Sequence, residues 1–140
     1  AARLGLKEEM RDFWDQTAGL DLDFDHGGAG QGVHIANAAA TWMVAVLGFA
    51  GVASAIWNDD LQINPQLPED WSRLAFPLAW KGCQAWIDIH KDAVVVKNQG
   101  TRAMKVTIRG QTKIVPAGEE FKLPAREFDQ VSRKIEMPGA

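Results

Sequence analysis

The stretch RLAFPLAWKGCQAWIDIH, residues 73–90, alternates apolar and polar side chains at a period of two. The apolar positions are Leu74, Phe76, Leu78 and Trp80 in the first half and Ala85, Ile87 and Ile89 in the second. This alternation is typical of strands that place one face in a core and the other in solvent. The stretch therefore predicts two neighbouring strands of a half-buried sheet.

Further short strands are predicted on both sides of this pair. Residues 61–71 read as a short strand followed by a turn with two prolines, and residues 93–98 as a third buried run. Residues 103–110 alternate again, and residues 112–124 supply two more strands around a Pro116–Gly118 turn. Six or seven short strands separated by turns favour a small antiparallel β-sandwich.

The N-terminal part has helical spacing instead. Residues 3–17 carry apolar side chains at intervals of three and four, and residues 21–32 are rich in glycine and predict a loop. A second helix is predicted from about Val33 to Leu47, ended by Gly48 and Gly51. This helix is apolar on every side, which is typical of a helix buried inside a larger body.

Composition excludes several classes of function. The net charge of −3 gives no electrostatic reason to expect nucleic acid as a partner. Residues 35–56 hold no charged side chain, but their Ala- and Gly-rich composition and the lack of basic flanks favour a buried helix over a membrane span. Cys83, the single cysteine, is expected to be a buried thiol in a reducing compartment, and with no visible signal peptide the expected location is cytoplasmic.

The glycine-rich entry GAGQGVHIANAAATW, residues 29–43, allows three readings. A dinucleotide loop is disfavoured because the glycine spacing is wrong and an acidic segment precedes it. A metal site is disfavoured because His26 and His34 have no partners at ligand spacing, so no metal is expected. An anion site fits better, since His34 falls in the first turn of a helix entered through glycines. From the residues alone, however, a simple polar cap is the favoured reading of His34, and the anion site stays an alternative.

Two motifs in order resemble glycoside hydrolase family 65. The first is Asp-Leu at residues 21–22, followed by GVHIA at 32–36, Trp42 and GFAG at 48–51. The second is LQINPQLPEDW at residues 61–71. The family contains maltose, trehalose, kojibiose and nigerose phosphorylases and some α-glucoside hydrolases, and the resemblance covers roughly residues 1–123.

The resemblance implies a mainly β chain with N-terminal helices. Residues 1–52 would be the last one or two helices of a catalytic (α/α)6 barrel, and residues 53–124 a C-terminal, jelly-roll-like β-sandwich. Residues 125–140 form a tail that the resemblance does not cover. The remainder of the barrel, or self-association of this chain, would then cover the apolar second helix.

The resemblance also implies inverting phosphorolysis of an α-linked glucose disaccharide. His34 and Gly32 would belong to the phosphate site, and Trp42 is a candidate for the glucose pocket. Inorganic phosphate would be the co-substrate and no cofactor is expected. The catalytic glutamic acid is expected upstream of these residues, so the chain is not expected to be active alone.

Two alternatives stay open. The loop carries Gly28-Ala29 where family members often have Asn-Thr, and Ala39-Ala40 replace a more frequent glycine pair, so phosphorylase and hydrolase are not distinguished. A different class of function is a free-standing carbohydrate-binding or interaction β-sandwich module without catalysis. The disaccharide linkage is not given by the sequence.

Overall fold

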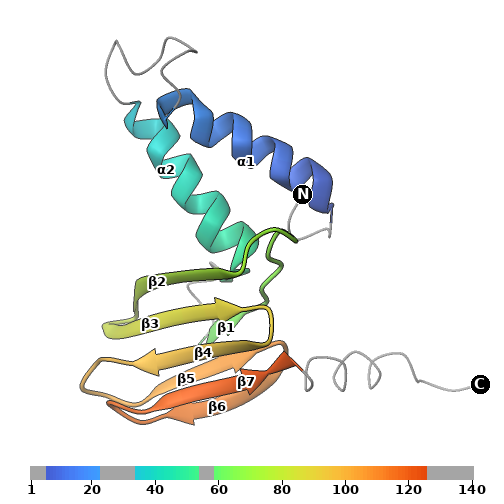
Figure 1. Ribbon diagram of the computed structural model, residues 1–140. Coiled ribbons are helices and arrows are strands. Elements are labelled where there is room, and N and C mark those ends of the chain that lie inside the picture. The colour runs from blue at the N-terminus through green and yellow to red at the C-terminus, as the bar shows by residue number, and fades with distance from the viewer. Residues whose placement is uncertain (1–5, 23–33, 54–58, 126–140) are drawn as a thin grey trace, which may run out of the picture.

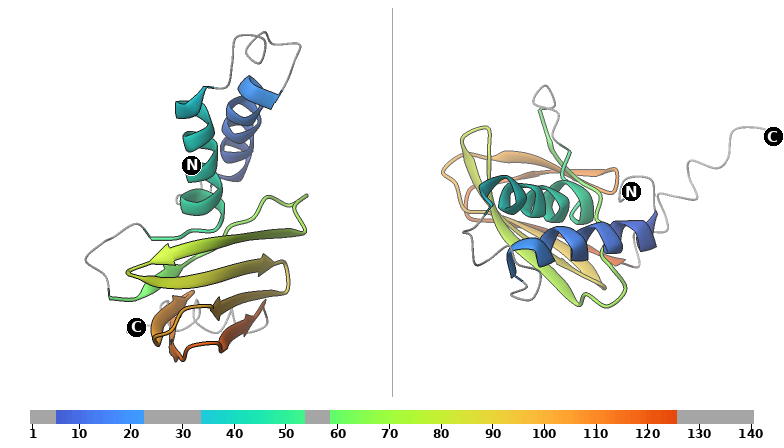
Figure 2. Two further views of the ribbon diagram at one scale, coloured as in Figure 1. Left: turned by 90° about the vertical axis from the view of Figure 1, so that its left-hand side faces the viewer. Right: turned by 90° about the horizontal axis from the view of Figure 1, so that it is seen from above.

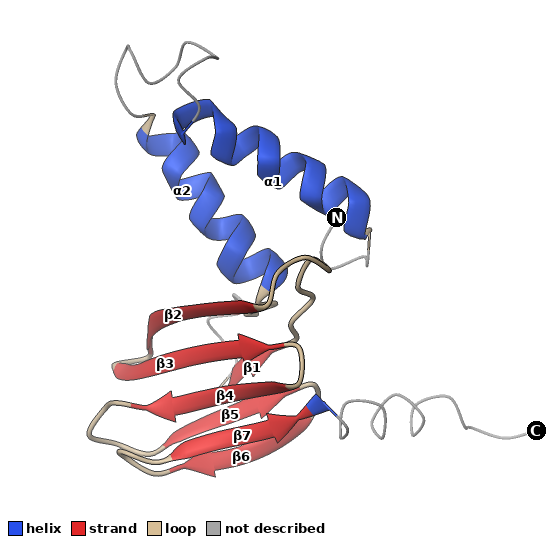
Figure 3. Ribbon diagram, viewed as in Figure 1, coloured by secondary structure: helices blue, strands red, loops and turns tan. Residues whose placement is uncertain are grey.

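Residues 6–22, 34–53 and 59–125 are described by a computed structural model, in which helices lead into a strand-rich body (Figure 1). Figure 3 shows the helical and strand-rich parts in separate colours. The elements in chain order are α1 (Lys7–Leu22), α2 (Ile35–Met43), the π-helix η4 (Val44–Phe49), β1 (Leu61–Ile63), β2 (Arg73–Trp80), β3 (Cys83–His90), β4 (Ala93–Asn98), β5 (Met104–Ile108), β6 (Gln111–Val115) and β7 (Glu120–Pro124). The mainly β fold with N-terminal helices is confirmed.

The strands form two sheets that pack face to face. One sheet has the order β2-β3-β4-β7, and all its neighbouring strands are antiparallel. The other has the order β1-β5-β6, and here β1 runs parallel to β5, with Leu61 opposite Val106 and Ile63 opposite Ile108. The sequence predicted an antiparallel sandwich. The parallel pair departs from it locally because the long connection over residues 64–103 lets the chain cross over before β5 begins.

The core lies between the sheets and takes every second side chain. In β3 the buried and less buried positions alternate strictly, as the sequence predicted. Six fully buried residues show the two sides of the core: Ile87, Val94 and Val96 from the four-stranded sheet, and Ile63, Val106 and Ile108 from the other. Burying a side chain of this size contributes about 1.5–3 kcal/mol, so this interior accounts for the fold of the strand-rich part. Cys83 is buried and unpaired, as expected.

The helices lie beyond the β2 edge of the sandwich, as Figure 1 and both views of Figure 2 show. β2 is an edge strand, and Pro77 is accommodated there, opposite Trp86, with its side chain on the outward face. Near its start, Leu74 of this edge strand packs against Met10 and Phe49 of the helical part.

Both helices end later than the sequence predicted. The first runs to Leu22 instead of ending near residue 17, and the second continues past Gly48 as η4 up to Phe49. The predicted stop at Gly48 is wrong because Phe49 is fully buried, and this packing outweighs the roughly 1 kcal/mol that glycine costs inside a helix. Gly51, with φ +63°, does end the segment. Within the described residues no helix is both long and apolar enough to span a bilayer.

Candidate functional site

His34 stands at the entry of α2. It is the N-cap residue, with extended backbone angles of φ −82° and ψ 101°. Its carbonyl accepts hydrogen bonds from the N–H groups of Asn37 at 2.9 Å and Ala38 at 3.0 Å, so the helix begins directly after it. Its side chain is exposed and makes no capping hydrogen bond to the helix. An exposed imidazole at the positive end of a helix is an arrangement that suits an anion.

A polar contact fixes this helix entry against α1. The side-chain amide of Asn37 donates from Nδ2 to the carbonyl of Thr17 at 2.8 Å, across the interface between the two helices. Asn37 lies one turn after His34, so this bond sets where the start of α2 points relative to α1. Asn37 was not among the predicted site residues, although an amide inside a run of small apolar residues was the available signal.

The two predicted site residues that the structure describes, His34 and Trp42, are not brought together. Trp42 lies eight residues after His34 on the same helical segment, which is about 12 Å along the helix axis. Its side chain is 51% exposed. Gly32 lies outside the described residues. The assignments of His34, Gly32 and Trp42 therefore stay predictions.

Both helices expose large apolar side chains. On α1 and just before it, Leu6, Phe13 and Leu20 recur every seven residues and are 44–61% exposed. On α2, none of the nine residues is buried, and Ile35 is 84% exposed. A monomeric protein seldom leaves such a row of apolar side chains in water. These faces match the expectation that the helices need more protein around them.

A compact joint connects the helices to the sandwich. The rings of Trp14, Phe49 and Trp71 meet edge to face, with centroids 5.0–5.3 Å apart. Below them, the backbone N–H of Asn64 donates to the carbonyl of Gly51 at 3.1 Å, and that of Gln66 donates to Phe49 at 2.7 Å. Each aromatic pair contributes about 0.5–1.5 kcal/mol beyond its buried area. The joint thus holds α1, η4 and the segment after β1 as one unit.

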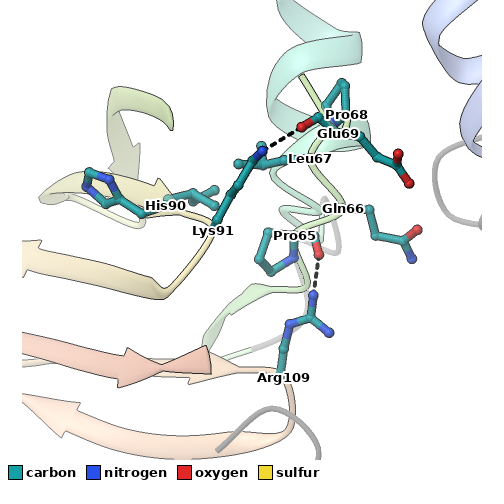
Figure 4. A pocket seen from close by; sticks show the side chains of 9 residues that line it. Pro65, Gln66, Leu67, Pro68, Glu69, His90, Lys91 and Arg109 are labelled. Carbon is teal, nitrogen blue, oxygen red and sulfur yellow. Dashed lines mark hydrogen bonds between the residues drawn. The ribbon is translucent and has the colours of Figure 1, made fainter. Parts of the chain in front are cut away.

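A groove of about 690 Å³ runs beside this joint (Figure 4). Lys91 donates from Nζ to the carbonyl of Glu69 at 2.6 Å, and Arg109 donates from Nη2 to the carbonyl of Pro65 at 2.7 Å. Figure 4 shows both side chains reaching from strand ends toward the 65–69 segment. These two hydrogen bonds hold residues 65–69 against the sandwich. The alternating pattern of residues 103–110 gave no sign of this role of Arg109.

The titratable groups with clear partners are held in their charged forms. The Arg73 guanidinium makes two hydrogen bonds to Asp88, at 2.8 and 2.9 Å, and this lowers the pKa of the Asp88 carboxyl. Arg11 pairs with Asp70 and lowers the pKa of that carboxyl too. A general acid needs a raised pKa, so these carboxylates serve as structural partners. Among the described residues, no three His, Cys, Asp or Glu side chains gather as a metal site would require.

Comparison with known proteins shows which family this chain is similar to. Residues 55–115 match the family described as "Glycosyl hydrolase family 65, C-terminal domain". Over 120 residues the chain is 32% identical to "Kojibiose phosphorylase" of Escherichia coli (strain K12), covering 86% of this chain and 15% of that protein. Over 123 residues it is 37% identical to "Alpha,alpha-trehalose phosphorylase" of Geobacillus stearothermophilus, covering 88% and 16%.

A solved structure shares the fold. It is described as "Putative kojibiose phosphorylase from human microbiome" and aligns with a TM-score of 0.76 at 24% identity, over 89% of this chain and 16% of that one. The chain therefore spans about 15% of the length of the relatives it matches. The ordered motifs and these matches agree: the chain belongs to glycosyl hydrolase family 65 and corresponds to a C-terminal portion of its members.

Proposed function

We propose that this chain is the C-terminal part of an inverting phosphorylase that acts on α-linked glucose disaccharides. The observation that carries the proposal is the match over 120 residues or more, which is most of this chain, to proteins named kojibiose phosphorylase and trehalose phosphorylase. The single unpaired, buried cysteine supports a cytoplasmic location.

In this proposal His34 contacts inorganic phosphate. The imidazole and the positive end of α2 hold the phosphate oxygen that attacks the anomeric carbon from the face opposite the leaving sugar. Phosphate is already anionic, so it needs positioning and not the general base that a water nucleophile requires. As the new C–O bond forms, the glycosidic C–O bond breaks, and a glutamic acid from another part of the enzyme protonates the departing oxygen. Gly32 lets the backbone approach the phosphate, and Trp42 borders the glucose pocket.

The helices belong to a larger helical body in this proposal. The exposed apolar stripes of α1 and α2 pack against further helices of an (α/α)6 barrel, for which residues 1–52 supply the last members and residues 53–124 the closing sandwich. These stripes speak against a free-standing carbohydrate-binding module, because such a module would leave them in water. Self-association of this chain through the same stripes is the alternative to a covering barrel.

A chimera tests the proposal. Residues 1–124 would replace the matched portion of the Escherichia coli kojibiose phosphorylase, and the product would be assayed with kojibiose and with trehalose. We expect phosphate-dependent release of a glucose 1-phosphate. His34→Ala should raise the KM for phosphate at least tenfold, the order expected from losing a charge-assisted hydrogen bond, with little change in the KM for the disaccharide.

His90→Ala is the matched control, since it removes another histidine from the distant strand β3. It should leave the KM for phosphate unchanged. Release of free glucose at the same rate without phosphate would assign a hydrolase and overturn the phosphorylase proposal. A folded, active chimera in which His34→Ala keeps the wild-type KM for phosphate would overturn the role of His34.

A further inference from the structure

A cavity of about 220 Å³ lies at the end of the sandwich opposite to the groove of Figure 4. It opens where β2 ends and where β3 and β5 begin, and its apolar floor includes Cys83 and Met104. We propose that this cavity is a binding site for a phosphate group, either inorganic phosphate or the phosphate of a sugar ester. This site is separate from the one proposed at His34.

Basic side chains surround the cavity. Among the described residues, Lys81, Arg102 and Lys105 line it with one carboxylate, Asp59, which is 3.5 Å from the Lys81 ammonium and 95% exposed. The nearby carboxylate of Asp60 also interacts electrostatically with Lys105. The chain as a whole carries a net charge of −3, whereas three cations near two carboxylates leave a local excess of positive charge at this cavity. Such a concentration of positive charge attracts an oxyanion.

The basic residues are held by the turns that carry them. Lys81 and Gly82 form the tight β2–β3 turn, with φ values of +45° and +78° that fit a type I′ hairpin. Arg102 donates from Nη2 to the carbonyl of Lys81 at 3.1 Å, which fixes the guanidinium across this turn. A Cβ at Gly82 would lie 3.0 Å from the same guanidinium nitrogen, a contact that a small shift of the flexible Arg102 side chain would relieve. The hydrogen bond to Lys81 thus places the guanidinium before any ligand arrives.

A buried donor points to a ligand with oxygen acceptors. Trp80 lines the cavity, and its Nε1 atom is buried without a hydrogen-bond acceptor among the described residues. A buried indole N–H normally donates a hydrogen bond to an acceptor, and leaving that hydrogen bond unmade costs free energy. The Trp80 side chain as a whole is half-buried, so a small rotation of the indole would present this N–H to a phosphate oxygen in the cavity. The volume holds a phosphate group and several waters, since liquid water occupies about 30 Å³ per molecule.

The test follows the indole N–H signals of the chain by ¹H–¹⁵N NMR. The sequence has six tryptophans, and Trp80→Phe identifies the signal of Trp80 by its disappearance. Titration with inorganic phosphate, and separately with glucose 1-phosphate, should shift this signal in a saturable way. Sodium chloride at equal ionic strength should not. The ligand with the lower Kd identifies the source of the phosphate group.

Matched variants separate this site from general charge effects. Arg102→Gln should weaken binding at least tenfold, whereas Lys122→Gln, which removes one exposed positive charge from β7, should change the Kd less than twofold. His34→Ala should leave the Trp80 shift unchanged, so failure here and failure at His34 can be told apart. The proposal is overturned if phosphate leaves the Trp80 signal unmoved, or if Arg102→Gln and Lys122→Gln weaken binding equally.

Discussion

Replacing Gly51 with alanine tests the joint between the helices and the sandwich. Gly51 has φ +63°, a conformation that costs a residue with a Cβ about 1–2 kcal/mol. A Cβ built there would lie 1.9 Å from the carbonyl oxygen of Asn64 and 2.5 Å from its carbonyl carbon. Both atoms belong to the backbone, so the two segments must separate. The hydrogen bond from Asn64 N–H to the Gly51 carbonyl would then be lost, at a further cost of about 1 kcal/mol.

We therefore expect Gly51→Ala to lower the free energy of unfolding by about 3 kcal/mol or more. Gly118→Ala is the matched control, because Gly118 has φ +78° but nothing within 4 Å of a built Cβ. Gly118→Ala should lower the free energy of unfolding only by the cost of placing a Cβ at positive φ, about 1–2 kcal/mol. Urea unfolding followed by tryptophan fluorescence, with linear extrapolation to water, measures both values. Equal losses in the two variants would refute the close approach at Asn64.

Two further predictions concern single side chains. Asn98 is fully buried and donates from Nδ2 to the carbonyls of Arg102 at 2.7 Å and Val115 at 2.9 Å. Asn98→Ala should therefore lower the free energy of unfolding in urea by about 3 kcal/mol, whereas Gln99→Ala at the exposed neighbour should lower it by less than about 0.5 kcal/mol. The pKa of Asp88 is lowered by Arg73, so the stability this carboxylate contributes is present above the unfolded-state pKa of about 3.9 and is lost as the pH falls through the lower folded-state pKa. Asp88→Asn should then lower the urea midpoint at pH 7 and lose that effect progressively as the pH falls below the unfolded-state value, and an undiminished effect in acid would contradict the pairing.

The strands could be predicted because their signal is local. Alternation at period two in residues 73–90 depends only on which face of the sheet is buried, and β3 reproduces it position by position. The helical continuation past Gly48 could not be predicted in this way. It depends on the burial of Phe49 between Trp14 and Trp71, which lie 35 and 22 residues away in the sequence.

The candidate site was only partly accessible from the sequence. The placement of His34 at a helix entry follows from the glycines before it and the apolar run after it. The contact between Asn37 and Thr17 and the braces from Lys91 and Arg109 to backbone carbonyls were not predictable, because a carbonyl acceptor leaves no trace in the side-chain pattern. The parallel pairing of β1 with β5 was also not predictable, because the tertiary core sets the register between strands that are distant in the sequence.

That parallel pair has a consequence for synthesis on the ribosome. β1 ends at residue 63, but its partner β5 is complete only at residue 108. At elongation rates of about 5–20 residues per second, the partner follows about 2–9 seconds later. During that interval neither β1 nor the joint above it has the sheet on which it finally packs. The helices and the joint formed with Trp71 therefore precede the completed sandwich, and their apolar faces depend on other contacts or on chaperones during that interval.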